Sequence, residues 1–314
     1  MKKPAEKGRH SSKRATKPPA EAQPTVRRPL ETGEAFTKKH QAVLSRLIEK
    51  RWRAQAKTNA GITQAEQRAN EPLLRLVERS PDAKVASREL GRLRVKAWAE
   101  RAALRQRGEL QFRDGPSPFS FRPIGAGVNV FGPPYDWEVR DPTSGASVGV
   151  TPNRFDGTFS VGLGPGQGGA RWATAGVGMV LQASIPGVAH VSPYWPFDFD
   201  WWIEGHWLSG HTTGACKIVV QDAFTGAVLG PLGERNVQFW DHTSQTSASD
   251  ENGDTLWPPD VEATVALAAG QVFKVTFLAT ALVDDSEGNI FGWSLAAAGL
   301  RMRVPFFTVR MNIP

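Results

Sequence analysis

Short runs in which apolar and polar residues alternate fill the chain beyond Asp114, and this alternation constrains the fold more than any other feature. In one such run, Cys216, Ile218 and Val220 alternate with polar residues. Because successive side chains of a β-strand point to opposite faces of the sheet, each run predicts a strand with one apolar face. Gly, Pro, Asn and Asp separate the runs, which is typical of turns.

About ten strands in roughly 200 residues, with no helical periodicity between them, predict an all-β fold. The expected strands cover Phe119–Pro123, Gly127–Phe131, Thr158–Leu163, Trp172–Gln182, Phe197–Trp207, Cys216–Gln221, Asn236–Trp240, Val261–Ala268, Phe273–Phe277, Asn289–Arg303 and Phe307–Ile313. We expect two antiparallel sheets packed face to face in a jelly-roll-like sandwich. Two acidic segments, Ser249–Asp254 and Asp284–Glu287, are expected to be solvated turns.

The first 110 residues have a different character. They hold 27 Lys and Arg against 12 Asp and Glu, a net charge of +15, whereas the remaining residues carry a net −8. Residues 1–30 contain almost no apolar side chains, which predicts a disordered basic tail. Apolar residues recur at three- and four-residue steps in 31–110, which predicts two or three basic amphipathic helices. The expected fold class is therefore α+β by segregation, with a β-sandwich domain over 114–314.

The positive charge of residues 1–110 favours an acidic partner, and nucleic acid, an anionic membrane surface or an acidic protein would each fit. The helical stripes can equally pack against each other or against a second copy, and we expect a homo-oligomer. The chain has no run of about 18 apolar residues, and no apolar stretch follows its basic start. A cytoplasmic protein with no signal peptide and no transmembrane segment is therefore expected.

The most aromatic segment of the chain is Pro193–Trp207. As a strand, it places four apolar residues on one face and Trp202, Asp198, Asp200 and Glu204 on the other. Carboxylates accept hydrogen bonds from hydroxyl groups while an indole covers the C–H face of a sugar ring, so these four residues are candidate carbohydrate ligands. The alternative is that Trp202 packs under a loop and the acids are solvated.

No catalytic residue, metal site or cofactor is assigned. Asp198 and Asp200 would need desolvation to serve as a glycosidase pair. His206 and His211 are five residues apart, which neither a helix nor a strand turns into a chelate. The segment Gly164–Gly169 has the letters of a dinucleotide fingerprint, but we expect a strand after it where a phosphate site needs a helix.

These observations favour a non-enzymatic binding or structural protein, in which a β-sandwich recognises a ligand or builds an assembly and a basic helical region tethers it. Two alternatives stay open. The chain could be a virion or particle component whose basic arm contacts nucleic acid, or a sandwich-fold glycoside hydrolase.

Overall fold

The computed structural model describes residues 122–142, 148–166, 168–206, 208–256, 261–285 and 293–312, together with isolated positions between Lys50 and Arg92. These isolated positions are α-helical and exposed. The predicted tail, most of the predicted helical region and the predicted domain start at Asp114 lie outside the described residues. No helix in the described part is long and apolar enough to cross a membrane.

The first of two sheets has six strands in the described ranges. They are β1 (Arg122–Ile124), β3 (Trp137–Pro142), β6 (Gly169–Ala183), β8 (Gly210–Asp222), β9 (Glu234–Ser244) and β12 (Val272–Asp285). Their order is β1-β6-β12-β8-β9, and β3 also pairs with β6. Strand β1 runs parallel to β6, so the prediction of purely antiparallel pairing is wrong at this short strand.

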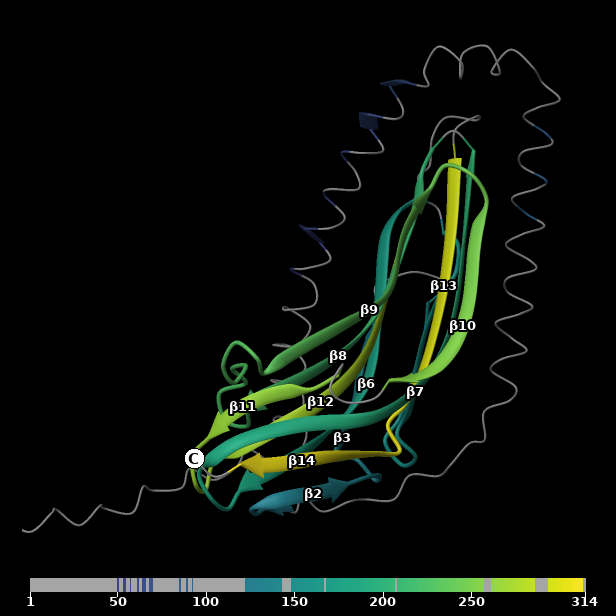
Figure 1. Ribbon diagram of the computed structural model, residues 1–314. Helices are drawn as coiled ribbons and strands as arrows, with labels where there is room; N and C mark the ends of the chain where they lie inside the picture. Colours follow the sequence, from purple (N-terminus) through teal and green to yellow (C-terminus); the bar gives the residue numbers. More distant parts are fainter. Residues whose placement is uncertain are drawn as a thin grey trace, which may run out of the picture. The chain divides into compact units, whose positions relative to one another are not determined.

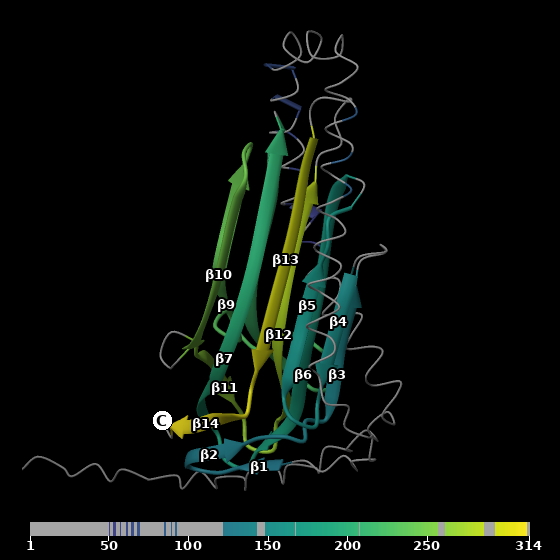
Figure 2. The ribbon, with the colours of Figure 1, turned by 90° about the vertical axis from the view of Figure 1, so that its right-hand side faces the viewer.

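The second sheet has eight strands in the described ranges. They are β2 (Gly127–Phe131), β4 (Val148–Asn153), β5 (Thr158–Leu163), β7 (Gly187–His206), β10 (Ala248–Leu256), β11 (Ala263–Leu267), β13 (Trp293–Arg303) and β14 (Phe306–Asn312). Their order is β2-β14-β7-β13-β5-β4. The long strand β7 pairs with β11 and β14 in its first half and with β10 and β13 in its second half (Figures 1 and 2).

The core lies between the two sheets and is built from the apolar side of each alternating run. Phe277 of β12 reaches across to the other sheet, where its ring centroid lies 5.0 Å from that of Phe307 in β14 and 5.8 Å from that of Trp195 in β7. All three side chains are fully buried. These contacts confirm the predicted β-sandwich, whereas its jelly-roll-like topology stays a prediction.

The predicted bounds agree with the structure for β2 and β5, and the other predicted strands fall within or overlap observed ones. Three strands, β3, β4 and β10, were not predicted. The prediction of a solvated turn at Ser249–Asp254 is wrong, because this segment forms most of β10 and pairs with β7. Every residue of β10 is exposed or half-buried, so this strand forms without an alternating buried face.

Candidate functional site

The second half of β7 presents two chemically different faces, as predicted. Trp201 and Ile203 are buried between the sheets, with 7% and 1% of their surface exposed. Asp198 is exposed, and Trp202 is half-buried, as are Asp200 and Glu204. The structure therefore brings all four predicted ligand residues to the outer face of the eight-stranded sheet.

Aromatic contacts on the inner face hold this part of β7 in its register. The ring of Trp201 stacks on His242 with their centroids 4.8 Å apart. The ring of Phe199 lies 4.9 Å from that of Trp240, and the Trp240 indole donates a hydrogen bond from Nε1 to Thr212 Oγ1 at 3.1 Å. A shift by one residue would expel the rings of Phe199 and Trp201 from the core, so the packing fixes which side chains of β7 face outward.

Cross-strand pairing defines what surrounds Trp202 on the outer face. Asp200 lies opposite Glu251 of β10 on one side and Gly299 of β13 on the other. The same row continues through Gly162 of β5 to Gly149 of β4. We call Gly149, Gly162 and Gly299 the glycine row, and Figure 2 shows β7, β13, β5 and β4 side by side in this order.

The glycine row leaves the outer face without side chains on the β13 side of Asp200. A Cβ atom placed on Gly162 would meet no atom within 4 Å. One flank of the row carries Trp202, with Ala297 as its neighbour on β13. The other flank carries Asp198 and, directly opposite on β13, the exposed Arg301. An indole, carboxylates and a guanidinium thus surround a bare stretch of sheet.

A second polar cluster, which sequence reasoning missed, lies on the outer face near the start of β7. His190 Nδ1 is 2.7 Å from Glu262 Oε1, and Ser192 Oγ donates to Glu262 Oε2 at 2.9 Å. Arg310 Nη2 lies 4.0 Å from the same carboxylate, and Asn312 Nδ2 is 3.2 Å from His190 Nε2. The Ser192 hydroxyl bonds the carboxylate and not the imidazole, so the cluster lacks the nucleophile–base contact of a hydrolytic triad.

His190 and Ser192 lie two residues apart in β7, so both side chains belong to one face of the strand. The sequence could have indicated this part of the cluster. Nothing in the sequence indicates Glu262, which lies 72 residues after His190.

His211 belongs to a third cluster, at the start of β8. Its Nδ1 lies 2.8 Å from Thr243 Oγ1, and its Nε2 lies 3.3 Å from Asp241 Oδ1. Burial lowers the pKa of His211, Asp241 opposes this change, and the neighbouring His242 adds to it. Across the described ranges, His, Cys, Asp and Glu side chains form no group of three or more that could hold a metal ion.

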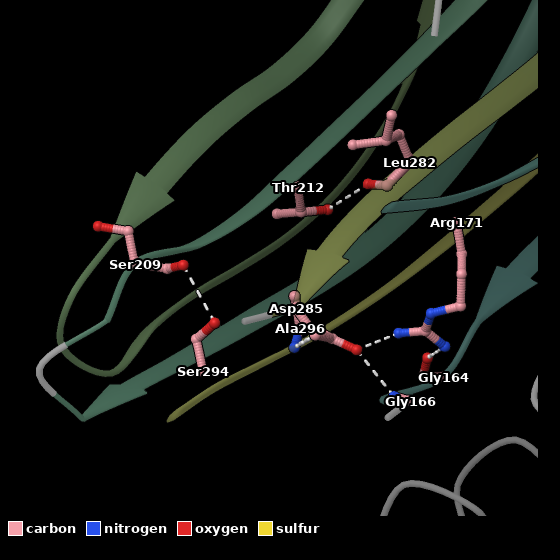
Figure 3. A network of polar contacts seen from close by, with 9 residues as sticks. All are labelled: Gly164, Gly166, Arg171, Ser209, Thr212, Leu282, Asp285, Ser294 and Ala296. Carbon is pink, nitrogen blue, oxygen red and sulfur yellow. Dashed lines mark hydrogen bonds and ion pairs between the residues drawn. The ribbon is translucent and has the colours of Figure 1, made fainter. Parts of the chain in front are cut away.

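Asp285, which we predicted to lie in a solvated turn, is buried at the end of β12, and that prediction is wrong. Its carboxylate forms an ion pair with Arg171 of β6 and accepts hydrogen bonds from the backbone N–H groups of Gly166 (2.8 Å) and Ala296 (2.5 Å), as Figure 3 shows. The guanidinium of Arg171 also donates to the carbonyl oxygen of Gly164. Burial raises the pKa of Asp285 to about 7, while Arg171 and the two amides act in the opposite direction.

The turn with the dinucleotide-like letters therefore serves this network. It is followed by strand β6, as predicted, and a Cβ on Gly166 would lie 2.5 Å from Cζ of Arg171. Glycine at this position lets the guanidinium pack against the backbone.

A buried lysine lies on the outer side of the six-stranded sheet. Lys274 of β12 is 2% exposed, and its Nζ is 5.6 Å from the ring centroid of Trp137 in β3. Desolvation lowers the pKa of Lys274 to about 7, and the charge of Asp222 opposes that shift. The alternation in β12 predicted that Lys274 lies on the face of the strand opposite the core. It could not predict that this side chain is buried there.

No family model and no curated protein matches the chain. Eight chains of solved structures have a weak likeness to it, including the following three. The enzymatically active domain of tailspike protein 4 of bacteriophage CBA120 is 16% identical over 54% of this chain and 19% of its own length, with a TM-score of 0.21. The C-terminal CBM6 module of the LamC laminarinase of Zobellia galactanivorans is 15% identical over 56% of this chain and 98% of its own, with a TM-score of 0.18. The CBM61 module bound to β-1,4-galactotriose is 13% identical over 58% of this chain and 88% of its own, with a TM-score of 0.17. TM-scores this low carry no argument about function.

Proposed function

We propose that the β-sandwich binds a carbohydrate on the outer face of the eight-stranded sheet, beside Trp202 and over the glycine row. The observation that carries this proposal is the placement of an indole and two carboxylates, Asp198 and Asp200, next to a stretch of sheet that has no side chains. Sugar recognition uses this combination, because a flat aromatic ring covers C–H groups and carboxylates accept hydrogen bonds from hydroxyls.

The dimensions of the face suit a short stretch of glycan. Neighbouring strands lie about 4.8 Å apart, so the three glycines of the row span roughly 10 Å across the sheet. Trp202 would cover one face of a sugar ring from the side of the row. Asp200, at the β7 end of the row, and Asp198 and Arg301, along its other flank, would bind hydroxyl groups.

Binding without hydrolysis is the form of this function that the geometry favours. Asp198 is exposed and Asp200 is half-buried. A glycosidase acid needs a carboxyl group held in surroundings that keep water away and raise its pKa. We therefore expect affinity for glycans and no release of reducing ends.

The tethering role of residues 1–110, with an acidic partner there, stays a prediction, as does a virion role. Most of the residues that would carry both lie outside the described part of the chain.

The test is a glycan-array screen with the full chain, followed by titration of the best glycan with wild-type protein and with Trp202→Ala. We expect the substitution to weaken binding by about tenfold to a hundredfold, the share that a central aromatic anchor commonly carries. Phe224→Ala is the matched control, because Phe224 is an aromatic residue that is 46% exposed on a turn of the other sheet.

Equal affinity of wild-type protein and Trp202→Ala would contradict the proposed site, and so would an equal loss in both variants. An array without any bound glycan would contradict the function. Release of reducing ends from the bound glycan would show that the protein is a glycoside hydrolase and not a non-enzymatic binding protein.

A further inference from the structure

Strand β2 forms an edge of the eight-stranded sheet. In the described part of the chain it pairs with β14 alone, so one side of its backbone has no strand beside it (Figure 1). An unpaired strand edge offers a row of N–H and C=O groups to which another strand can bond. Native proteins commonly protect such edges with charged residues, proline or a covering segment.

The side chains of β2 make this edge apolar as well as open. Val128 and Val130 point to the outer face and are 63% and 64% exposed. Phe306, at the start of the neighbouring strand β14, is 41% exposed, and its ring stacks on Tyr194 of β7 with the centroids 5.2 Å apart. Three of the six large apolar residues that are exposed in the described part therefore gather at this edge.

Other strands with only one neighbour in their ladder carry the usual protection. Strands β3, β9 and β10 each contain charged residues, and β4 contains Pro152. Strand β1 contains Arg122 and Pro123. Strand β11 has neither charge nor proline, but the backbone N–H of Thr264 in it donates to the carbonyl oxygen of Leu232 at 3.0 Å. Strand β2 has no charge and no proline, and its backbone makes no such bond to a residue in the described ranges.

We propose that two copies of this chain associate by antiparallel pairing of their β2 strands, with the two-fold axis at Asn129. The sequence of β2 suits this register, because Val128 and Val130 lie symmetrically on either side of Asn129. Pairing about that axis places Val128 opposite Val130 of the partner subunit and joins the two outer faces into one apolar strip. The result is a continuous sheet across both copies, independent of any bound carbohydrate.

The first test measures the dissociation constant of the dimer of the full chain by analytical ultracentrifugation, for wild-type protein and for Val128→Lys/Val130→Lys. We expect a wild-type dimer and a rise of the dissociation constant by at least about tenfold in the double variant, because lysine on an edge strand opposes pairing. Leu232→Lys is the matched control, since Leu232 is 62% exposed on a turn away from β2. A monomeric wild type, or a dimer that the double variant leaves unchanged, would overturn the proposal.

The second test reads the register by disulfide formation between full-length chains that carry Val128→Cys or Val130→Cys. Directly opposite residues have Cβ atoms about 5 Å apart, whereas residues displaced by two positions are roughly 7–8 Å apart, which is too far for a disulfide. A mixture of the two variants should therefore cross-link and each variant alone should not. This register would be overturned if either variant alone cross-linked as much as the mixture does. It would also be overturned if neither the mixture nor the single variants cross-linked. The native Cys216 is buried and does not compete.

Discussion

Trp201 and Trp202 are neighbours in the sequence but belong to opposite surfaces of one strand. Trp201 lies in the core and stacks on His242, whereas Trp202 is half-buried on the outer face beside Asp200. This separation follows from the two-residue period of a β-strand. The sequence was sufficient to predict it, because Phe197, Phe199 and Ile203 share the parity of Trp201 and mark the core side.

The two tryptophans should respond differently to truncation. Trp201→Ala would leave a cavity between the sheets and should lower the free energy of unfolding by about 3–5 kcal/mol. Trp202→Ala removes an indole from the outer face and should cost about 1 kcal/mol or less. Chemical denaturation of both variants measures these differences. A larger loss for Trp202→Ala than for Trp201→Ala would contradict the register of β7.

The burial of a single residue, Lys274, can be tested by the pH dependence of the unfolding free energy. Its pKa is lowered to about 7 in the folded chain, whereas an unfolded chain keeps its lysines protonated up to about pH 10. Between about pH 7 and 10 the unfolded state therefore binds more protons, and the unfolding free energy contributed by this group rises with pH by up to about 1.4 kcal/mol per unit.

Lys274→Met should remove that rise. The measurement is a series of urea melts of both proteins over this pH range, in which the stability of the wild type should gain on that of the variant as the pH increases. Parallel pH profiles for the two proteins would show that Lys274 titrates as an ordinary exposed lysine.

At the scale of elements, the sequence predicted only the second half of the long strand β7. Alternation predicted the second half. The first half was not predicted as a strand, because Pro193 and Pro196 interrupt the alternating pattern. On one edge of β7, pairing with β11 ends at Val191 and pairing with β10 begins at Trp195. Pro193 lies between these two points, where no strand of the described ranges pairs with that edge. Local sequence carries no information on such a gap, because the neighbouring strands come from distant parts of the chain.

The Arg171–Asp285 ion pair illustrates the same limit between elements. It joins β6, the end of β12, β13 and the turn before β6 through residues 114 positions apart (Figure 3). An acidic pair beside a serine and a glutamate is typical of a turn, and only the arrival of Arg171 and two backbone amides makes burial of Asp285 favourable.

Breaking one side of this pair should be costly. Asp285→Asn would leave the buried guanidinium of Arg171 without a counter-charge and should lower the unfolding free energy by about 3–5 kcal/mol. The apolar double variant Arg171→Met/Asp285→Leu removes both charges and should be clearly more stable than Asp285→Asn. A double variant that is less stable than the single one would show that the pair itself, and not the unpaired charge, dominates.

For the whole molecule, the contrast between a basic first part and an acidic β-rich part predicts separable units. A fragment of residues 114–314 should fold alone, because the strands described from Arg122 onward enclose their own apolar core. Far-ultraviolet circular dichroism with a β signature and a cooperative thermal melt would confirm it. An insoluble or non-cooperative fragment would indicate that residues 1–110 cover a face of the sandwich.

The proposed carbohydrate site requires that the ligand lies on the bare stretch of sheet beside Trp202. Gly162→Val tests this most directly, because its side chain would project into open space above the sheet and a β-branched residue is well tolerated in a strand. The measurement is calorimetric titration of the best array glycan into wild-type protein, Gly162→Val and the control Gly125→Val, which fills open space elsewhere. We predict that both variants melt at the same temperature as the wild type. Gly162→Val should lose affinity for the glycan by at least about tenfold, and Gly125→Val should lose none. A folded Gly162→Val variant that binds the glycan as tightly as the wild type would contradict the account.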